Sequence, residues 1–158
     1  MQNITPFLWF DGNLEEAVNF YTSIFKNSLI KNVSHYGDNA QFPRGSIMTA
    51  TFQLDGVEFM GINGGPQFNF TPAISFFAKC ETQDQIDDLW EKLSTGGEAQ
   101  RCGWIKDRFG ISWQIVPNLL GTYLQDKDSE KARRVMDTML RMDKIIISDL
   151  IAAYEGMI

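Results

Sequence analysis

Apolar residues in the first part of the chain recur with two different spacings. Between residues 14 and 25 they return every three or four positions, which predicts an amphipathic helix. Asn13 precedes this helix and is a candidate N-cap, because its side chain can accept a hydrogen bond from the first turn. Asp55-Gly56 predicts a hairpin turn. Short β-type runs stand at residues 4–10, 29–36, 46–54 and 57–62.

The same order of elements returns further along the chain in compressed form. A β-type run at residues 73–80 leads into a second amphipathic helix. Thr82 and Gln85 form a capping box at its start, and Gly96-Gly97 ends it. Strand-like runs follow at residues 99–106 and 111–116.

These two stretches, residues 4–63 and 72–118, superpose when one is shifted by 69 positions. The apolar stripes of the two helices then coincide, and Phe7 falls on Phe76. A chance match between two amphipathic helices is the alternative, but the matched order of the flanking strands argues against it. We therefore predict an α+β fold built from two paired βαβββ modules.

The remaining residues, 119–158, contain two further helical stripes with Asp143-Lys144 between them. We expect two amphipathic helices that pack either on the sheet domain or on a partner subunit. A chain of 158 residues fits one domain with a sizeable core. Residues 1–118 are expected to form this domain, with 119–158 as its helical extension.

Charge and composition exclude several classes of function. The net charge of −6 disfavours nucleic acid as a partner, because a phosphate-binding face needs surplus cations. No apolar run approaches the roughly 20 residues of a membrane span, so we expect no membrane partner. Two cysteines in 158 residues fit a reducing compartment, and we expect a cytoplasmic protein.

Four stretches of sequence, taken together and in order, resemble a known family. They are ITPFLWFDGNLEEAVNFYTSIF (4–25), GSIMTATFQLDG (45–56), FMGINGGPQFNFTPAISF (59–76) and CGWIKDRFGISWQIVP (102–117). The chain resembles the PhnB-like family, labelled 3-demethylubiquinone-9 3-methyltransferase domain. This family belongs to the glyoxalase/bleomycin-resistance/dioxygenase, or vicinal oxygen chelate, superfamily. The resemblance implies paired βαβββ modules that each form half of a cup for a small ligand or metal, commonly in homodimers.

The same resemblance bears on metal binding and on methyl transfer. Metal-using members place one His, Glu or Gln on each of four strands, and the matching positions here are Thr5, Met60, Ala73 and Gln114. Gln114 alone offers a suitable oxygen, so we expect no metal and no other cofactor. A methyltransferase usually carries a Gly-rich βα turn, and the sequence has no G-x-G motif, which disfavours that activity.

Alternation along the strands indicates which residues would line such a cup. The lining is predicted to be mainly aromatic and apolar with a few polar groups, as is typical of a small-molecule site. The alternative is that the same side chains simply fill the cup as core. The predicted ligand-binding residues are Thr5, Phe7, Trp9, Met60, Ser75, Trp104, Ser112 and Gln114.

Other reactive side chains favour structural roles. His35 lies beside a polar loop and is expected at the surface. Cys80 and Cys102 are expected to be inert thiols rather than a nucleophile or redox pair. Asp107 is placed either as a turn residue, which we favour, or as a general base.

Three functions remain open from the sequence. The first is a homodimeric protein that binds a small, partly apolar molecule in a metal-free cup. The second is an enzyme of the same superfamily, metal-independent or weakly metal-dependent, with lyase or isomerase chemistry. The third is a purely structural dimerisation domain.

Overall fold

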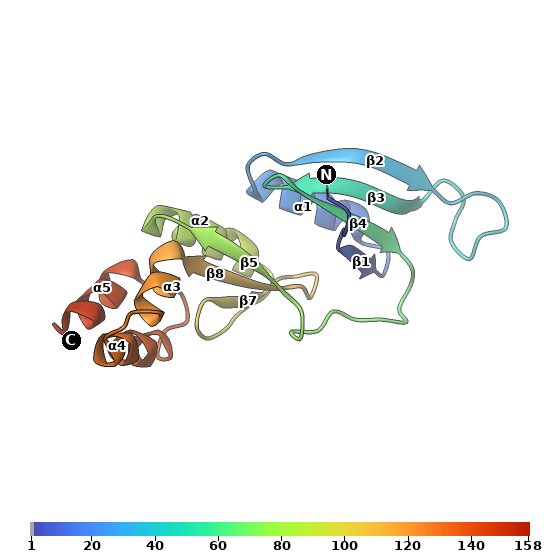
Figure 1. The fold of residues 1–158 in the computed structure, drawn as a ribbon. Coiled ribbons are helices and arrows are strands. Elements are labelled where there is room, and N and C mark those ends of the chain that lie inside the picture. Colours follow the sequence, from blue (N-terminus) through green and yellow to red (C-terminus); the bar gives the residue numbers. More distant parts are fainter. Residues whose placement is uncertain (1) are drawn as a thin grey trace. The chain divides into compact units, whose positions relative to one another are not determined.

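The order strand–helix–strand–strand–strand occurs twice in the structure, as the sequence predicted. The computed structural model describes residues 2–158, which divide into two compact units, the first ending at Phe70 and the second beginning at Thr71 (Figure 1). The first unit consists of β1 (Phe7–Phe10), α1 (Leu14–Ile24), β2 (Leu29–His35), β3 (Ile47–Leu54) and β4 (Val57–Asn63).

The second unit repeats this series and then adds helices. Its first part consists of β5 (Ser75–Cys80), α2 (Gln83–Ser94), β6 (Glu98–Ala99), β7 (Trp104–Lys106) and β8 (Ser112–Pro117). Three further helices follow, which are α3 (Asn118–Leu124), α4 (Ser129–Met139) and α5 (Ile147–Glu155). The sequence predicted two helices in this region, and the short α3 is additional.

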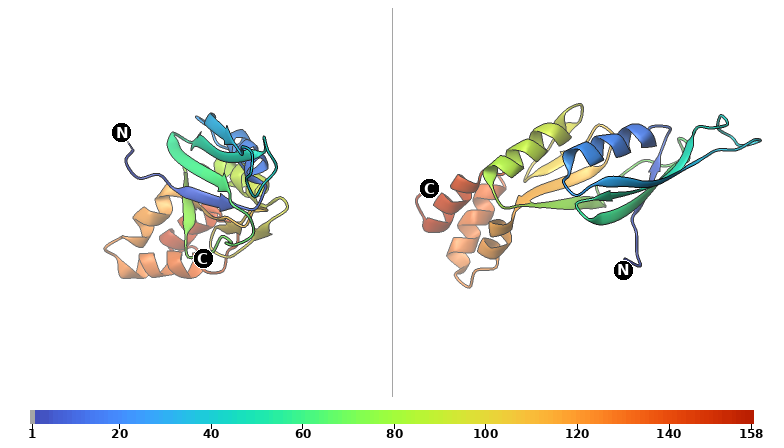
Figure 2. Two further views of the ribbon diagram at one scale, coloured as in Figure 1. Left: turned by 90° about the vertical axis from the view of Figure 1, so that its right-hand side faces the viewer. Right: turned by 90° about the horizontal axis from the view of Figure 1, so that it is seen from above.

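Both four-stranded sheets have the same topology. The strand orders are β1-β4-β3-β2 and β5-β8-β7-β6, and in each sheet the first strand pairs in parallel with the last. A parallel pair needs a crossover connection, and here the crossover carries the helix. Seen from above in Figure 2, each of α1 and α2 lies along one face of its own sheet. The predicted α+β fold of paired βαβββ modules is confirmed.

The predicted superposition is correct for the helices and wrong by one residue for the first strands. Phe7 lies on the helix-free face of its sheet and is 53% exposed. Phe76 instead faces the helix side, where its ring contacts Trp113 at 5.3 Å between centroids. The equivalent of Phe7 is Phe77, which is also 53% exposed. The strand and helix of the second module are therefore one residue closer together than in the first.

The predicted strand at 99–106 is a tight hairpin. The amide of Gln100 donates to the carbonyl of Trp104 at 2.9 Å, and the turn between them has Cys102 and Gly103 at φ +58° and +80°. A Cβ on Gly103 would lie 2.7 Å from the carbonyl oxygen of Ile115, so only glycine fits beside β8. This turn divides the run into β6 and β7.

Helix capping differs between the two modules. The predicted cap by Thr82 is confirmed, since its hydroxyl accepts from the amide of Gln85 at 3.3 Å. Asn13 makes no side-chain cap, contrary to expectation. The buried side chain of Asn63 takes that role, because its Oδ1 accepts from the amide of Leu14 at 3.0 Å. Its Nδ2 donates to the carbonyl of Ile47 at 3.0 Å, which ties β3 to the same point.

Asp107 organises the turn between β7 and β8. Its Oδ1 accepts from the amides of Phe109 and Ile111 at 2.9 and 3.0 Å, and its Oδ2 accepts from the indole of Trp113 at 2.8 Å. The residue is 2% exposed. The turn interpretation of Asp107 is confirmed, because both carboxylate oxygens accept hydrogen bonds within the turn or from Trp113.

The C-terminal helices pack on the end of β8. Val116, Leu120, Val135, Ile145 and Leu150 form a buried cluster between them. Two side chains fasten these helices through backbone groups. Gln83 donates to the carbonyl of Ile145 and accepts from the amide of Ile147, at 3.1 and 2.8 Å. Arg134 donates to the carbonyls of Ala153 and Tyr154, both at 2.8 Å, and so satisfies the carboxyl end of α5.

Replacing Asp107 with Asn is expected to lower the free energy of unfolding by about 2 kcal/mol. The new amide group turns a hydrogen toward Trp113 or toward the turn amides, which leaves one buried donor without an acceptor. Urea denaturation measures this loss. Asp11→Asn, at an exposed position, is the control. Equal midpoints for the two variants would contradict the role of Asp107.

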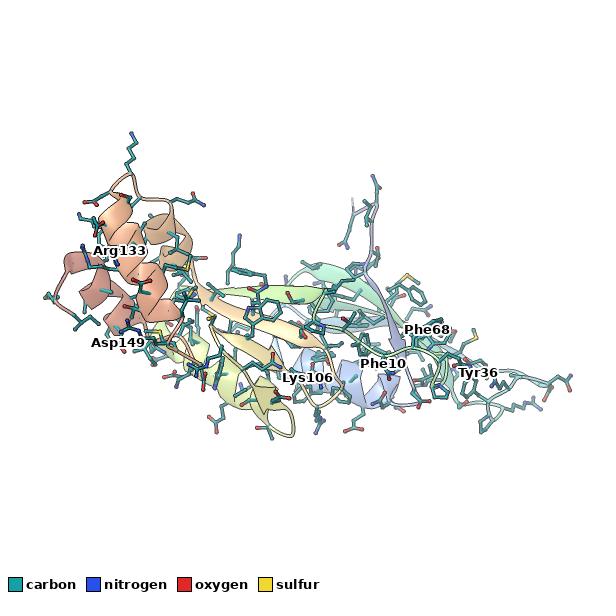
Figure 3. The ribbon with its side chains drawn as sticks, turned by 90° about the horizontal axis from the view of Figure 1, so that it is seen from below. Phe10, Tyr36, Phe68, Lys106, Arg133 and Asp149 are labelled. Atoms are coloured by element: carbon teal, nitrogen blue, oxygen red, sulfur yellow. The ribbon has the colours of Figure 1, made fainter. Side chains whose placement is uncertain are left out.

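Arg134→Met is expected to lower the free energy of unfolding by about 1–2 kcal/mol, because two carbonyls of α5 lose a charged donor. Arg133→Met is the matched control on the same helix. Arg133, labelled in Figure 3, pairs with the exposed Glu130 and Asp137, and such surface pairs contribute little. Thermal and urea melts compare the two, and an equal effect of both would contradict the capping role.

Candidate functional site

Each sheet has one face without a helix, called here the open face. In the first unit the open face changes character from one edge to the other. In its two central rows the side chains from β1 and β4 are apolar, whereas those from β3 and β2 are polar. Its two central rows are Phe7–Met60–Thr51–Asn32 and Trp9–Ile62–Thr49–Ser34.

Trp9 is held by the segment that follows β4. Its indole N–H donates to the carbonyl of Gly65 at 2.9 Å, and the ring of Phe68 meets it edge-on at 5.0 Å. A Cβ on Gly64 would lie 2.2 Å from the indole, so this ring packs directly on the glycine backbone. Phe68 is 63% exposed and is labelled in Figure 3. The polar edge of Trp9 is therefore already used within the first unit.

The open face of the second sheet combines aromatic and polar groups. Register places Trp104, Gln114 and Phe77 in one row across β7, β8 and β5. The next row contains Lys106, Ser112 and Ser75. Adjacent strands lie about 4.8 Å apart and same-face rows about 6.7 Å apart, so all six side chains fall within one small ligand's length.

Hydrogen bonding on this face leaves several polar groups available. Gln114 Nε2 donates to the hydroxyl of Ser75 at 2.9 Å. Within residues 2–158, no hydrogen bond is found for Gln114 Oε1 or for the indole N–H of Trp104. Ser112 is nearly buried, at 3% exposure, whereas Ser75, Trp104 and Gln114 are half-buried. The face thus offers a free acceptor and a free donor beside two aromatic rings.

Within each unit the predicted site residues lie on the same open face, except Thr5, which precedes β1. Thr5, half-buried, precedes Phe7 and Trp9 at the start of β1, and Met60 is the register partner of Phe7. The second unit holds the other predicted residues on its open face, namely Ser75, Trp104, Ser112 and Gln114. Alternation from Trp104 also indicates Lys106, which is not among the predicted site residues.

The positions matched to the superfamily's metal ligands do not fit a divalent ion. Thr5 and Ala73 precede their strands, and Met60 offers no oxygen. Gln114 is a possible oxygen ligand, and its amide nitrogen is already bonded to Ser75. Across the described chain no three His, Cys, Asp or Glu side chains group as a metal site. Oxygen-liganded cations need several such donors.

The histidine and the two cysteines are not part of the rows described above. His35 is exposed at the end of β2, as predicted. Cys80 and Cys102 are not joined in a disulfide. Cys80 is buried, and burial raises the pKa of its thiol, so it stays protonated and unreactive at neutral pH.

Two pockets of about 430 Å³ each lie in the second unit, and none of the predicted site residues lines either of them. The first lies where the loop after α2 meets the β7–β8 turn. Gly97 makes this contact possible, since a Cβ there would lie 2.3 Å from the carbonyl of Lys106. The second pocket lies between the starts of α2 and α5, beside the ion pair of Asp87 with Lys144 at 2.7 Å. The pocket between the loop after α2 and the β7–β8 turn is lined by Gly96, Gly97, Glu98, Lys106, Asp107, Arg108, Phe109 and Gly110.

A comparison with protein families shows which family this chain belongs to. The model of the family described as 3-demethylubiquinone-9 3-methyltransferase matches residues 2–116. The chain belongs to this family. The match ends within β8, so α3, α4 and α5 lie beyond the part that the 3-demethylubiquinone-9 3-methyltransferase family shares. No curated protein matches the chain.

Solved structures agree with this assignment. A putative 3-demethylubiquinone-9 3-methyltransferase, PhnB protein, from Bacillus cereus is 41% identical, with a TM-score of 0.69 over 73% of this chain and 99% of its own. Protein PA1353 from Pseudomonas aeruginosa is 22% identical, with a TM-score of 0.62 over 74% and 98% of the two chains. A mutant of the fosfomycin resistance protein FosX from Listeria monocytogenes, complexed with Mn(II) and 1S,2S-dihydroxypropylphosphonic acid, is 14% identical. Its TM-score is 0.53 over 73% and 91%. The fold is that of the glyoxalase/bleomycin-resistance superfamily.

The protein is expected to purify without a stoichiometric transition metal, because the matched positions supply too few donors. Elemental analysis after dialysis against Mn²⁺, Zn²⁺, Ni²⁺ or Fe²⁺ should give well below one ion per chain. One tightly held ion per chain would contradict this expectation. A Gln114→Ala variant then tests whether that ion uses the one plausible ligand.

Proposed function

We propose that this protein binds a small, partly apolar molecule on the open face of its second sheet, without a metal. The observation that supports this most directly is the row of Trp104, Gln114 and Phe77. Phe77 is 53% exposed, and two flanking rings offer an apolar body a large contact area. Gln114 Oε1 and the Trp104 indole fix its orientation by hydrogen bonds. A mainly apolar surface with few polar groups is typical of such sites.

The first unit adds an apolar surface of its own under this proposal. Phe7 and Met60 lie side by side on its open face, and Thr5 lies just before β1. Trp9 contributes its ring to this surface, because its N–H already donates to the carbonyl of Gly65. These residues form the part of the predicted ligand-binding set that belongs to the first unit.

An enzyme of the same superfamily is the alternative, and the site residues favour binding over it. Lyase or isomerase chemistry needs a group that accepts a proton. The carboxylate of Asp107 is engaged by two amides and an indole. Methyl transfer is not supported either, since the chain lacks a Gly-rich βα turn for a methyl donor.

We also propose that the protein is a cytoplasmic homodimer. The sheets end in β1 and β2 in one unit and in β5 and β6 in the other, and edge strands of this kind are usually paired or covered. Two cysteines without a disulfide suit a reducing compartment. No helix among residues 2–158 has the length and apolar character needed to cross a membrane.

Titration with phenylnaphthylamine, a neutral and fluorescent aromatic probe, tests the proposal. We expect saturable binding that Trp104→Ala weakens by about 1–3 kcal/mol, because a central aromatic contact is lost. Trp90→Ala is the matched control, since Trp90 belongs to α2, which packs on the other face of the same sheet.

Thermal melts of both variants separate a binding role from a core role. If Trp104→Ala lowers the melting temperature strongly and leaves the affinity of the folded protein unchanged, Trp104 is core and the proposed site is wrong. An absence of saturable binding to the unmodified protein would contradict the proposal as well.

A further inference from the structure

The polar row next to Trp104 indicates which chemical class of molecule this face selects. It consists of Lys106, Ser112 and Ser75, with Lys106 at one end on β7 and Ser75 at the other on β5. Ser75 accepts its hydrogen bond from Gln114, so its own hydroxyl hydrogen remains free to donate. An ammonium group and a hydroxyl donor thus lie on either side of the nearly buried Ser112.

Lys106 carries a positive charge that no carboxylate of the described chain neutralises within 4.0 Å. Glu98 is its register partner on β6, and the Glu98 carboxylate accepts from Gln100 at 3.4 Å instead. Asp107, the next residue, directs both oxygens toward the turn and Trp113. The nearest carboxylate in sequence is therefore already satisfied on the helix side of the sheet.

The pocket beside this row adds a second cation. Lys106 lines the 430 Å³ pocket together with Arg108, whose guanidinium lies 4.9 Å from the centre of the Phe109 ring. Glu98 is the acidic residue that lines the same pocket with a carboxylate not fixed in the turn. Lys106, labelled in Figure 3, is exposed at the end of β7.

Lys79 is the other lysine on this open face, and its surroundings differ. It lies on β5 beyond Phe77, and its register partner is the buried, apolar Val116. No hydroxyl or amide accompanies it in that row. A second feature, the hydrogen-bond donor of Ser75, thus distinguishes the Lys106 end of the face from the Lys79 end.

We propose that the ligand is a small organic anion with a planar apolar body. The body lies between Trp104 and Phe77, and its carboxylate, sulfonate or phosphate group lies at the Lys106 end of the face. This inference rests on the proposed function and deepens it, because it assigns the charge of the ligand and its direction on the sheet. An ammonium and a hydroxyl donor suit a singly charged oxyanion group.

The experiment compares two probes that differ by one charged group. Anilinonaphthalene sulfonate carries a sulfonate, and phenylnaphthylamine is its neutral counterpart. Lys106→Met is expected to weaken binding of the sulfonate probe about fivefold, or about 1 kcal/mol, and to leave the neutral probe within about twofold. Lys79→Met is the matched control, because it removes the same charge from the same face and should leave both affinities unchanged.

Two further readouts fix the position of the probe. The sulfonate probe should shift the indole N–H signal of Trp104 in a two-dimensional NMR spectrum. Its affinity for the unmodified protein should fall as salt rises, and that dependence should be weaker in Lys106→Met, since screening acts on the charged contact. Thermal melts confirm that both lysine variants are folded.

The outcomes separate this inference from the proposed function. If the neutral probe binds and depends on Trp104, but Lys106→Met leaves the sulfonate affinity unchanged, the anion inference is wrong and the binding function stands. An equal loss in Lys79→Met would also overturn it, because the charge would then act without the hydroxyl row. If neither probe binds near Trp104, the proposed function itself fails.

Discussion

The parallel pairing of the first and last strands in each module determines the rest of the structure. Antiparallel neighbours can be joined by a tight turn, but β1 with β4 and β5 with β8 run in the same direction. The chain must therefore cross over after the first strand, and it does so as an amphipathic helix. That helix covers one face of the sheet and leaves the other open. The candidate site exists because of this asymmetry.

Local sequence patterns predicted the elements where the determining contacts are local. The stripes of α1 and α2 and the Thr82 cap depend on residues three or four positions apart, and these predictions hold. The cap of α1 comes instead from Asn63, 49 residues away from Leu14. No local pattern shows that contact, so Asn13 was the natural but wrong choice.

The candidate site was predictable to the extent that strand alternation decides it. Period-two alternation predicted that Met60 lies on the same face of its strand as Ile62, and that Gln114 shares a face with Ser112. It could not show that the indole N–H of Trp9 already donates a hydrogen bond to the carbonyl of Gly65. Nor could it show the turn at Cys102 and Gly103, because a positive φ at a cysteine has no sequence pattern of its own.

The way in which the C-terminal helices are fastened gives them an unequal tolerance to mutation. Gln83 holds the segment before α5 by the carbonyl of Ile145 and the amide of Ile147. Substituting Gln83 removes both bonds at once. Almost any side chain at position 147 keeps the bond made there, with proline as the exception because it has no amide hydrogen. The attachment at position 147 therefore depends on the backbone and tolerates a change of side chain, whereas the attachment at Gln83 depends on one particular side chain.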